Sequence, residues 1–175
     1  MKTALNQQLQ TLNDSLDALF ADLAQHSSAV LNSPPAPDSW SPMQVLHHLL
    51  LSEKYSRLYC EKKLSHQPEL TQAGVGTWFR TKLVRWYLLS PLKFKAPPGI
   101  SGEALPASDE LPNVIAQYHA ERENFQAFLN ELPDEYLDKE VYKHPFGGRL
   151  TIGGMMTFFT AHFENHRRQI YRALR

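Results

Sequence analysis

Residues 151–174, TIGGMMTFFTAHFENHRRQIYRAL, predict a long amphipathic helix that packs one face into a helical core. At 3.6 residues per turn, one stripe along this helix is apolar apart from two histidines. The members of the stripe are Met155, Phe159, His162, His166 and Ile170. Glu164 and Arg168 fall on other sides, so the two histidines lie one turn apart on the face expected to be buried.

Three more segments carry similar stripes. The first is a run of leucines that fades at the proline-rich stretch NSPPAPDSW, and its members are Leu5, Leu9, Leu12, Leu16, Leu19 and Leu23. The second extends from Pro42 to Leu64, with Ser41 and Gln44 in the pattern of a capping box. The third begins near Ser108, and its stripe consists of Leu111, Ile115, Tyr118, Arg122, Phe125, Leu129 and Leu132. Each segment therefore predicts a helix with one buried face.

Four such helices, without a convincing strand pattern, predict an all-α fold, namely a four-helix bundle in a single domain over residues 1–175. Residues 67–107 are less regular, and TWFRTKLVRWYLLS within them favours one short amphipathic helix. Residues 133–150 form a turn-rich connection that contains HPFGGR. The long connection between the second and third helices favours a crossover topology.

Composition excludes several classes of protein. The formal net charge is zero, so no global charge favours nucleic acid or an anionic membrane as a partner. The single cysteine, Cys60, excludes a disulfide framework and cysteine-rich zinc sites, and its place off the buried stripe argues against a nucleophile. No apolar run is long enough to span a membrane, and the start lacks the apolar core of a signal peptide. We expect a cytoplasmic protein.

The histidines indicate a metal site. His162 and His166 have the i, i+4 spacing that converges two imidazoles on one ion. On the second helix, His48 points inward on the wheel, whereas His47 falls with the charged residues that mark the solvent side, namely Lys54, Arg57 and Glu61. Three inward histidines on two helices suit zinc, nickel, iron or manganese and leave positions open. The alternative is a buried polar cluster without metal.

Two stretches also carry a family resemblance. WSPMQVLHHLL, followed far downstream by HPFGGRLTIGGMMTFFTAHFENHRRQI, resembles the DinB-like superfamily, which includes the YfiT-type proteins. The stretch KFKAPP is similar too. The resemblance implies a four-helix bundle whose metal is held by His48, eight residues after the Trp of the first motif, and by the pair His162 and His166, which Gln169 and Ile170 follow. All three ligand positions are intact here, although some members have lost theirs.

The resemblance indicates a class of reaction but no specific substrate. Characterised relatives include transferases and an isomerase that use low-molecular-weight thiols such as bacillithiol, mycothiol or glutathione, and many members have no known reaction. We therefore expect a metal-dependent transferase that uses a small thiol. A metal-dependent hydrolase and a non-catalytic bundle that binds metal or a small ligand are the alternatives. No carboxylate is placed as a general base, since Glu53 is turned away from the histidines and Glu164 faces solvent.

Other polar side chains on predicted buried faces are candidate substrate contacts. Arg122 interrupts the stripe of the third helix, either as an ion-pair partner or as an anchor for a substrate carboxylate. Tyr55 and Tyr59 share the inward face of His48, and their hydroxyls are candidates for reaching a ligand. The remaining histidines have structural interpretations: His26 and His66 exposed, His119 beside an apolar stripe, and His144 hydrogen-bonded within its turn. A place for His144 near the mouth of the site is the alternative.

One segment has no acidic residue and interleaves cations with aromatic side chains. Residues 77–95 contain Arg80, Lys82, Arg85, Lys93 and Lys95 together with Trp78, Phe79, Trp86 and Tyr87. Three interpretations stay open: aromatics packed on the bundle or on a partner in a homodimer, a lid that attracts an acidic co-substrate, and contact with an anionic surface. Nucleic acid is excluded, because no recognition motif is present.

Overall fold

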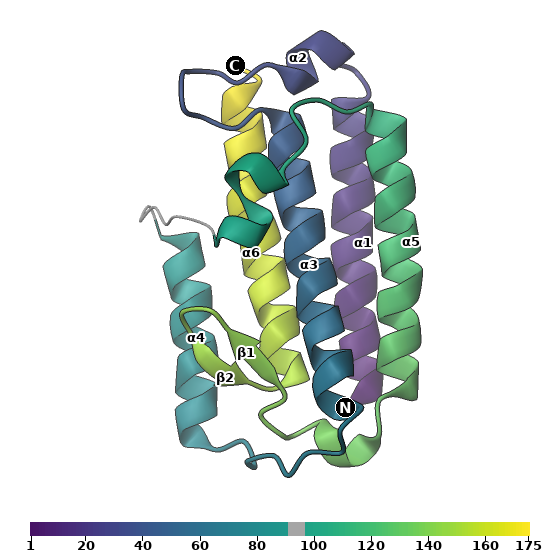
Figure 1. The fold of residues 1–175 in the computed structure, drawn as a ribbon, viewed down its shortest axis with the longest axis vertical. Coiled ribbons are helices and arrows are strands. Elements are labelled where there is room, and N and C mark those ends of the chain that lie inside the picture. Colours follow the sequence, from purple (N-terminus) through teal and green to yellow (C-terminus); the bar gives the residue numbers. More distant parts are fainter. Residues whose placement is uncertain (91–96) are drawn as a thin grey trace.

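The computed structural model describes residues 1–90 and 97–175, and its four long helices stand side by side as a bundle (Figure 1). The bounds of these helices, α1, α3, α5 and α6, are Lys2–Leu23, Pro42–Leu64, Leu111–Glu131 and Ile152–Ala173. Helix α1 packs against α5 and α6, and α3 packs against the same two helices. Helices α1 and α3 therefore occupy opposite corners, and α3 meets a neighbour on both of its flanks.

Local sequence explains where these helices begin and which face they bury. All six leucines of the α1 stripe are buried, as their spacing predicts. At the start of α3, the Ser41 hydroxyl accepts a hydrogen bond from the Gln44 backbone N–H at 3.2 Å. The Gln44 side chain accepts one from the Ser41 N–H at 3.1 Å, which confirms the capping box. Within the described residues, no helix combines the length and apolar character needed to cross a membrane.

Smaller elements surround the bundle. They are the helices α2 (Ser28–Asn32) and α4 (Val75–Leu89), the 3-10 turns η1 (Pro98–Ile100), η2 (Gly102–Ala104) and η3 (Asp134–Tyr136), and the strands β1 (Tyr142–His144) and β2 (Gly148–Leu150). Helix α4 stands outside the bundle and packs against α6 (Figure 1). Strands β1 and β2 pair antiparallel, so the purely all-α prediction is wrong for this hairpin. Strands of three residues are too short to show alternation in a sequence.

The charged side of α3 is another correction. Arg57, which the wheel places toward solvent, is buried and donates to the Glu121 carboxylate of α5 at 2.6 Å. Glu53 is also buried, and its carboxylate lies 2.7 Å from Arg122 of α5. Because α5 packs on α3, the side of α3 that carries Glu53 and Arg57 faces α5 instead of solvent. The buried cations and anions instead pair across the α3–α5 interface.

The hairpin turn requires a glycine at position 147. A Cβ added there would lie 2.3 Å from Cγ2 of Val84 in α4, and a branched side chain with one favoured rotamer cannot move aside freely. We expect Gly147→Ala to lower the free energy of unfolding by about 1–3 kcal/mol in urea titration, through overpacking. Gly99→Ala is the control, since a Cβ added there meets no atom of the described residues within 4 Å. Equal effects of the two substitutions would contradict this packing.

Candidate metal centre

Three histidines from two helices converge in the structure. His48 comes from α3, and His162 and His166 come from consecutive turns of α6. One ring nitrogen from each lies within 4.8 Å of the other two. The Nε2 atoms of His48 and His162 are 3.1 Å apart. Two nitrogens bound to one tetrahedral ion at about 2.0–2.1 Å would be separated by about 3.3 Å, so this spacing fits a shared ion.

Hydrogen bonds at the other ring nitrogens orient two of these side chains. Nδ1 of His48 donates to the carbonyl oxygen of Ile100 in η1 at 2.7 Å. Nδ1 of His166 donates to Oε1 of Gln169, one turn further along α6, at 2.8 Å. A proton on Nδ1 leaves the lone pair on Nε2, which is the tautomer that a metal ligand needs. Ile100 and Gln169 are therefore positioning residues, which orient the rings of His48 and His166 respectively.

A single metal ion can bind the ring nitrogens of all three histidines, whereas hydrogen bonds among the three rings cannot pair all of them. The hydrogen bond available between His48 and His162 involves only two of them. His166 then still presents its Nε2 lone pair, whereas one divalent ion accepts all three nitrogens. The ring of His162 is buried and stacks on that of Phe158 with centroids 5.0 Å apart. The donor set therefore fits a divalent metal.

Burial keeps these imidazoles neutral. Desolvation lowers the pKa of His48, and it lowers the pKa of His162 well below the ordinary value for histidine. Desolvation and, to a lesser extent, repulsion from His48 lower the pKa of His166 to about 3. Neutral imidazole is the ligand form, so a metal would not have to displace protons from these rings at neutral pH.

Aromatic and backbone groups enclose the cluster. Trp40, which precedes α3, lies against His48 with ring centroids 4.9 Å apart. On another side η1 supplies the Ile100 carbonyl. Helical periodicity gave no signal for either contact, because both residues lie outside the four long helices. Trp40 belongs to the motif that precedes His48, and that motif is the only sequence feature that marks it.

His47 does not point to solvent as expected. Its side chain is buried, and its Nε2 lies 3.0 Å from Oδ2 of Asp109, in the segment that precedes α5. The prediction is wrong because this segment covers the side of α3 that the wheel assigns to water. His47 therefore ties two parts of the fold together, and it is separate from the histidine cluster.

The candidate substrate contacts occupy different places. Arg122 is buried against Glu53, which is the ion-pair alternative. Tyr55 is half exposed, so the inward orientation predicted for it is wrong, and Tyr59 is partly buried against the core. Glu53 faces Arg122 on α5, so its carboxylate serves that pair. A role of Arg122, Tyr55 and Tyr59 in binding substrate stays a prediction.

The remaining titratable side chains have structural surroundings. His26, His66 and His119 are exposed. The Cys60 thiol is fully buried, with its Sγ 3.8 Å from Sδ of Met155, and desolvation raises the pKa of this thiol. A buried thiol with a raised pKa is a poor nucleophile.

His144 lies beside the cluster without joining it. Its Nδ1 accepts hydrogen bonds from the backbone N–H groups of Phe146 and Gly147, at 3.2 and 2.8 Å, as the turn interpretation expects. Its ring packs against Phe158 with centroids 4.6 Å apart, and Phe158 in turn stacks on His162. Burial lowers the pKa of His144 to about 4.

This lowered pKa predicts a loss of stability in acid. The unfolded state takes up a proton near pH 6.5, whereas folded His144 does so only near 4, so its contribution is present above 6.5 and is lost as the pH falls through that window. The shift corresponds to about 3 kcal/mol. Asparagine at 144 retains an acceptor for both N–H groups and does not titrate. Urea titrations of metal-free protein at several pH values measure the effect. Between pH 6.5 and 4 the free energy of unfolding should fall less steeply for His144→Asn than for the wild type, and parallel curves would contradict this.

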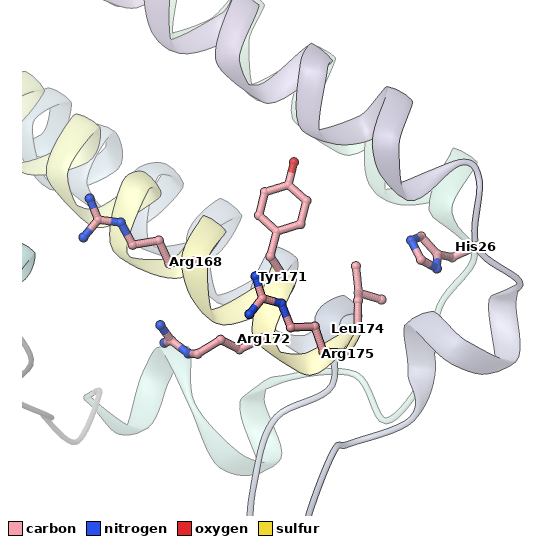
Figure 2. A pocket seen from close by; sticks show the side chains of 6 residues that line it. All are labelled: His26, Arg168, Tyr171, Arg172, Leu174 and Arg175. Carbon is pink, nitrogen blue, oxygen red and sulfur yellow. The ribbon is translucent and has the colours of Figure 1, made fainter.

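A surface pocket lies elsewhere, at the C-terminal end of α6 (Figure 2). Its volume is about 520 Å³, and its lining consists of His26, Arg168, Tyr171, Arg172, Leu174 and Arg175. The Tyr171 hydroxyl donates to Asp22 of α1 and so joins the ends of the two helices. Cations at the end of a helix also complement its dipole. None of the three clustered histidines lines this pocket, so it is distinct from the candidate metal centre.

Comparison with known proteins places the chain in a family. The sequence profile of the DinB superfamily matches residues 8–170, which includes all three clustered histidines. The chain belongs to the DinB superfamily. The resemblance expected from its two motifs is thereby confirmed, and this member of the DinB superfamily has the three histidines in contact distance of one another. Comparison with curated proteins gives no match.

One similar solved structure is YfiT from Bacillus subtilis, which is described as a probable metal-dependent hydrolase with an unusual four-helix bundle topology. The two structures superpose with a TM-score of 0.62 over 99% of this chain and 87% of YfiT, at 17% sequence identity. At this identity the likeness shows a shared fold, and it leaves the chemistry of this DinB-superfamily member to be argued from its own residues.

Proposed function

We propose that this DinB-superfamily protein is a divalent-metal-dependent enzyme, and that its reaction is the transfer of a small thiol to an electrophilic substrate. The observation that carries the proposal is the convergence of His48, His162 and His166, whose ring nitrogens lie within 4.8 Å of one another. Zinc, nickel, iron or manganese would suit this donor set. When bound, such an ion supplies Lewis acidity that lowers the pKa of a thiol or of water.

The chain's own residues would hold and orient that chemistry. The three histidines supply neutral nitrogens, and with three protein ligands positions remain for a small molecule. Ile100 and Gln169 fix the ring orientations of His48 and His166. Trp40 and Phe158 line the cluster with apolar surface, which strengthens electrostatic interactions there.

The ion pairs of the two carboxylates considered as general bases favour a thiol over water as the nucleophile. Glu53 is engaged with Arg122, and Glu164 pairs with Arg167 and Arg168. Both carboxylates therefore have other partners and are poorly suited to take a proton from water. A thiol needs less help, because its ordinary pKa of about 8.5 is already close to neutral.

Hydrolysis is the second candidate, and the similarity in fold to YfiT, with its description as a probable metal-dependent hydrolase, favours it. In this case water replaces the thiol as the nucleophile. The positions of the three histidines are equally compatible with both reactions. Only the co-substrate differs, so it is the co-substrate that an experiment must vary.

A turnover screen separates the candidates. Protein loaded in turn with each of the four metals is incubated with an electrophile or an ester, with and without glutathione, bacillithiol or mycothiol. We expect consumption of the electrophile that requires both metal and thiol, and that His166→Ala abolishes. Turnover at the same rate with and without the thiol would support the hydrolase. Tight metal binding without turnover in any combination would favour the non-catalytic alternative.

A further inference from the structure

Helix α4 exposes an apolar stripe that nothing in the described structure covers. Its members, each 55–82% exposed, are Val75, Trp78, Phe79, Leu83 and Trp86. Their spacing places them on one side of the helix, opposite Thr77 and Val84, which are buried. The interpretation in which Trp78, Phe79 and Trp86 pack on the bundle is therefore wrong, and Lys93 and Lys95 of the same segment lie outside the described residues.

The position of α4 makes this stripe accessible. The helix stands apart from the bundle with its inner side on α6, so its outer side faces away from the molecule (Figure 1). Eleven steps of 1.5 Å along the helix separate Val75 from Trp86, so the stripe is about 16 Å long. Phe146, at the tip of the neighbouring hairpin, is a further exposed aromatic side chain, and its neighbour Gly147 approaches Val84 of α4. Exposed apolar groups this concentrated mark an interaction site.

The charges on α4 indicate what kind of surface it meets. The helix has no acidic residue. Arg80 is paired with Glu140, while Lys82 and Arg85 are exposed. The Lys82 ammonium lies 5.6 Å from the ring centroid of Trp78, so cation and aromatic groups share one surface. The net charge of zero for the whole chain conceals this local excess of positive charge.

A second copy of the chain is a poor occupant. In a twofold dimer each surface meets its own equivalent, so Lys82 and Arg85 of one copy would approach the same cations of the other. The surface offers no acidic side chain of α4 to offset that repulsion. An anionic partner avoids it.

We propose that the outer face of α4 binds the surface of an anionic lipid bilayer. Tryptophan favours the boundary between acyl chains and headgroups, where its ring is buried and its N–H stays hydrated. A short helix with aromatic and leucine side chains on one side and lysine or arginine beside them has the composition of an interfacial helix. Lys82 lies within the stripe, over the ring of Trp78, and Arg85 lies at its edge, so both can extend their charged ends to the anionic headgroups. The bundle and its histidine cluster stay outside the bilayer, so this binding is independent of the proposed catalytic function.

The test is sedimentation of the full chain with vesicles, with EDTA present to remove any contribution of metal. One set of vesicles is phosphatidylcholine alone, and the other also contains phosphatidylserine. We expect binding to the anionic vesicles only, a blue shift of tryptophan fluorescence, and weaker binding as salt rises. Lys82→Gln with Arg85→Gln should reduce the affinity by about fivefold for each charge removed.

Two further variants separate the apolar contribution. Trp78→Gln with Trp86→Gln should weaken binding by tenfold or more, on the order of what burying one large apolar side chain contributes. Both side chains are exposed, so these substitutions leave the core intact. Val30→Ser on α2 and Lys54→Gln on α3 are matched controls for an exposed apolar group and an exposed cation, and both should bind as the wild type does.

Three results would overturn the proposal. The first is no binding to phosphatidylserine vesicles, and the second is binding that the α4 variants leave unchanged. The third is a dimer in light scattering that the double tryptophan variant converts to monomer, because the stripe would then be covered by a second copy. A monomer that binds anionic vesicles through α4 is the result expected.

Discussion

His162→Ala should weaken binding of a divalent metal by more than about 100-fold, since loss of a supporting residue alone typically costs 10–100-fold. Of the three clustered histidines, only His48 is more buried than His162, and the Nε2 atoms of these two rings are 3.1 Å apart. Its removal leaves two nitrogens, which is too few for the four-coordinate sites that divalent zinc prefers in proteins. Calorimetric titration of apoprotein with zinc or nickel measures the change.

The control for this variant is His119→Ala. His119 is exposed on α5, so its removal subtracts a histidine without touching the cluster. Wild type and His119→Ala should show the same affinity and the same rise of the melting temperature with metal. Unchanged affinity in His162→Ala would remove this residue from the site and leave the buried polar cluster as the better interpretation.

Arg122→Met should lower the free energy of unfolding by about 3–5 kcal/mol, because it strands a buried carboxylate. Arg122 and Glu53 lie 2.7 Å apart, with side chains 9% and 4% exposed, in the interface between α3 and α5. Adding Glu53→Leu to the same chain removes the unpaired charge and should recover most of the loss. Urea titration followed by circular dichroism measures both variants.

An exposed pair provides the comparison. Arg168→Met breaks the contact with Glu164 on the surface of α6, and we expect it to cost less than about 1 kcal/mol. A double variant that is no more stable than Arg122→Met would contradict the assignment of the penalty to the stranded carboxylate.

The long helices could be predicted because their signals are local. The leucine stripe of α1, the capping box of α3 and the periodicity of α6 each use residues within one helix. The same periodicity placed His48, His162 and His166 on inward faces, and the structure brings them together. A pattern of 3.6 residues is enough for this because each of these side chains faces α3 or α6 directly.

Side chains that depend on several neighbours could not be predicted in this way. A wheel assigns one buried face, but α3 contacts α5, α6, α2, η1 and β1. His47 and Arg57 are buried by partners far away in sequence, Asp109 and Glu121, which no local pattern reveals. The prediction for the half-exposed Tyr55 fails for the converse reason, since no residue that the structure describes covers the part of the stripe where it lies.

Short elements were missed because they carry too few residues. Helix α2 has five residues, and its start depends on a hydrogen bond from the Val30 N–H to the Ser27 hydroxyl. Helix α5, the third of the predicted helices, begins at Leu111 instead of near Ser108. The reason is that the backbone N–H and carbonyl of Asp109 form hydrogen bonds with the side chain of Asn32. Such contacts across the fold decide where a helix starts, and the intrinsic pattern of the helix does not contain them.

Elemental analysis of protein purified without an affinity tag tests the metal centre most directly. We expect one divalent ion for each chain, and loss of that ion together with the metal-dependent rise in melting temperature when His48, His162 or His166 is replaced by alanine. Protein with no stoichiometric metal, whose melting temperature does not change on addition of zinc, nickel, iron(II) or manganese, would contradict the account.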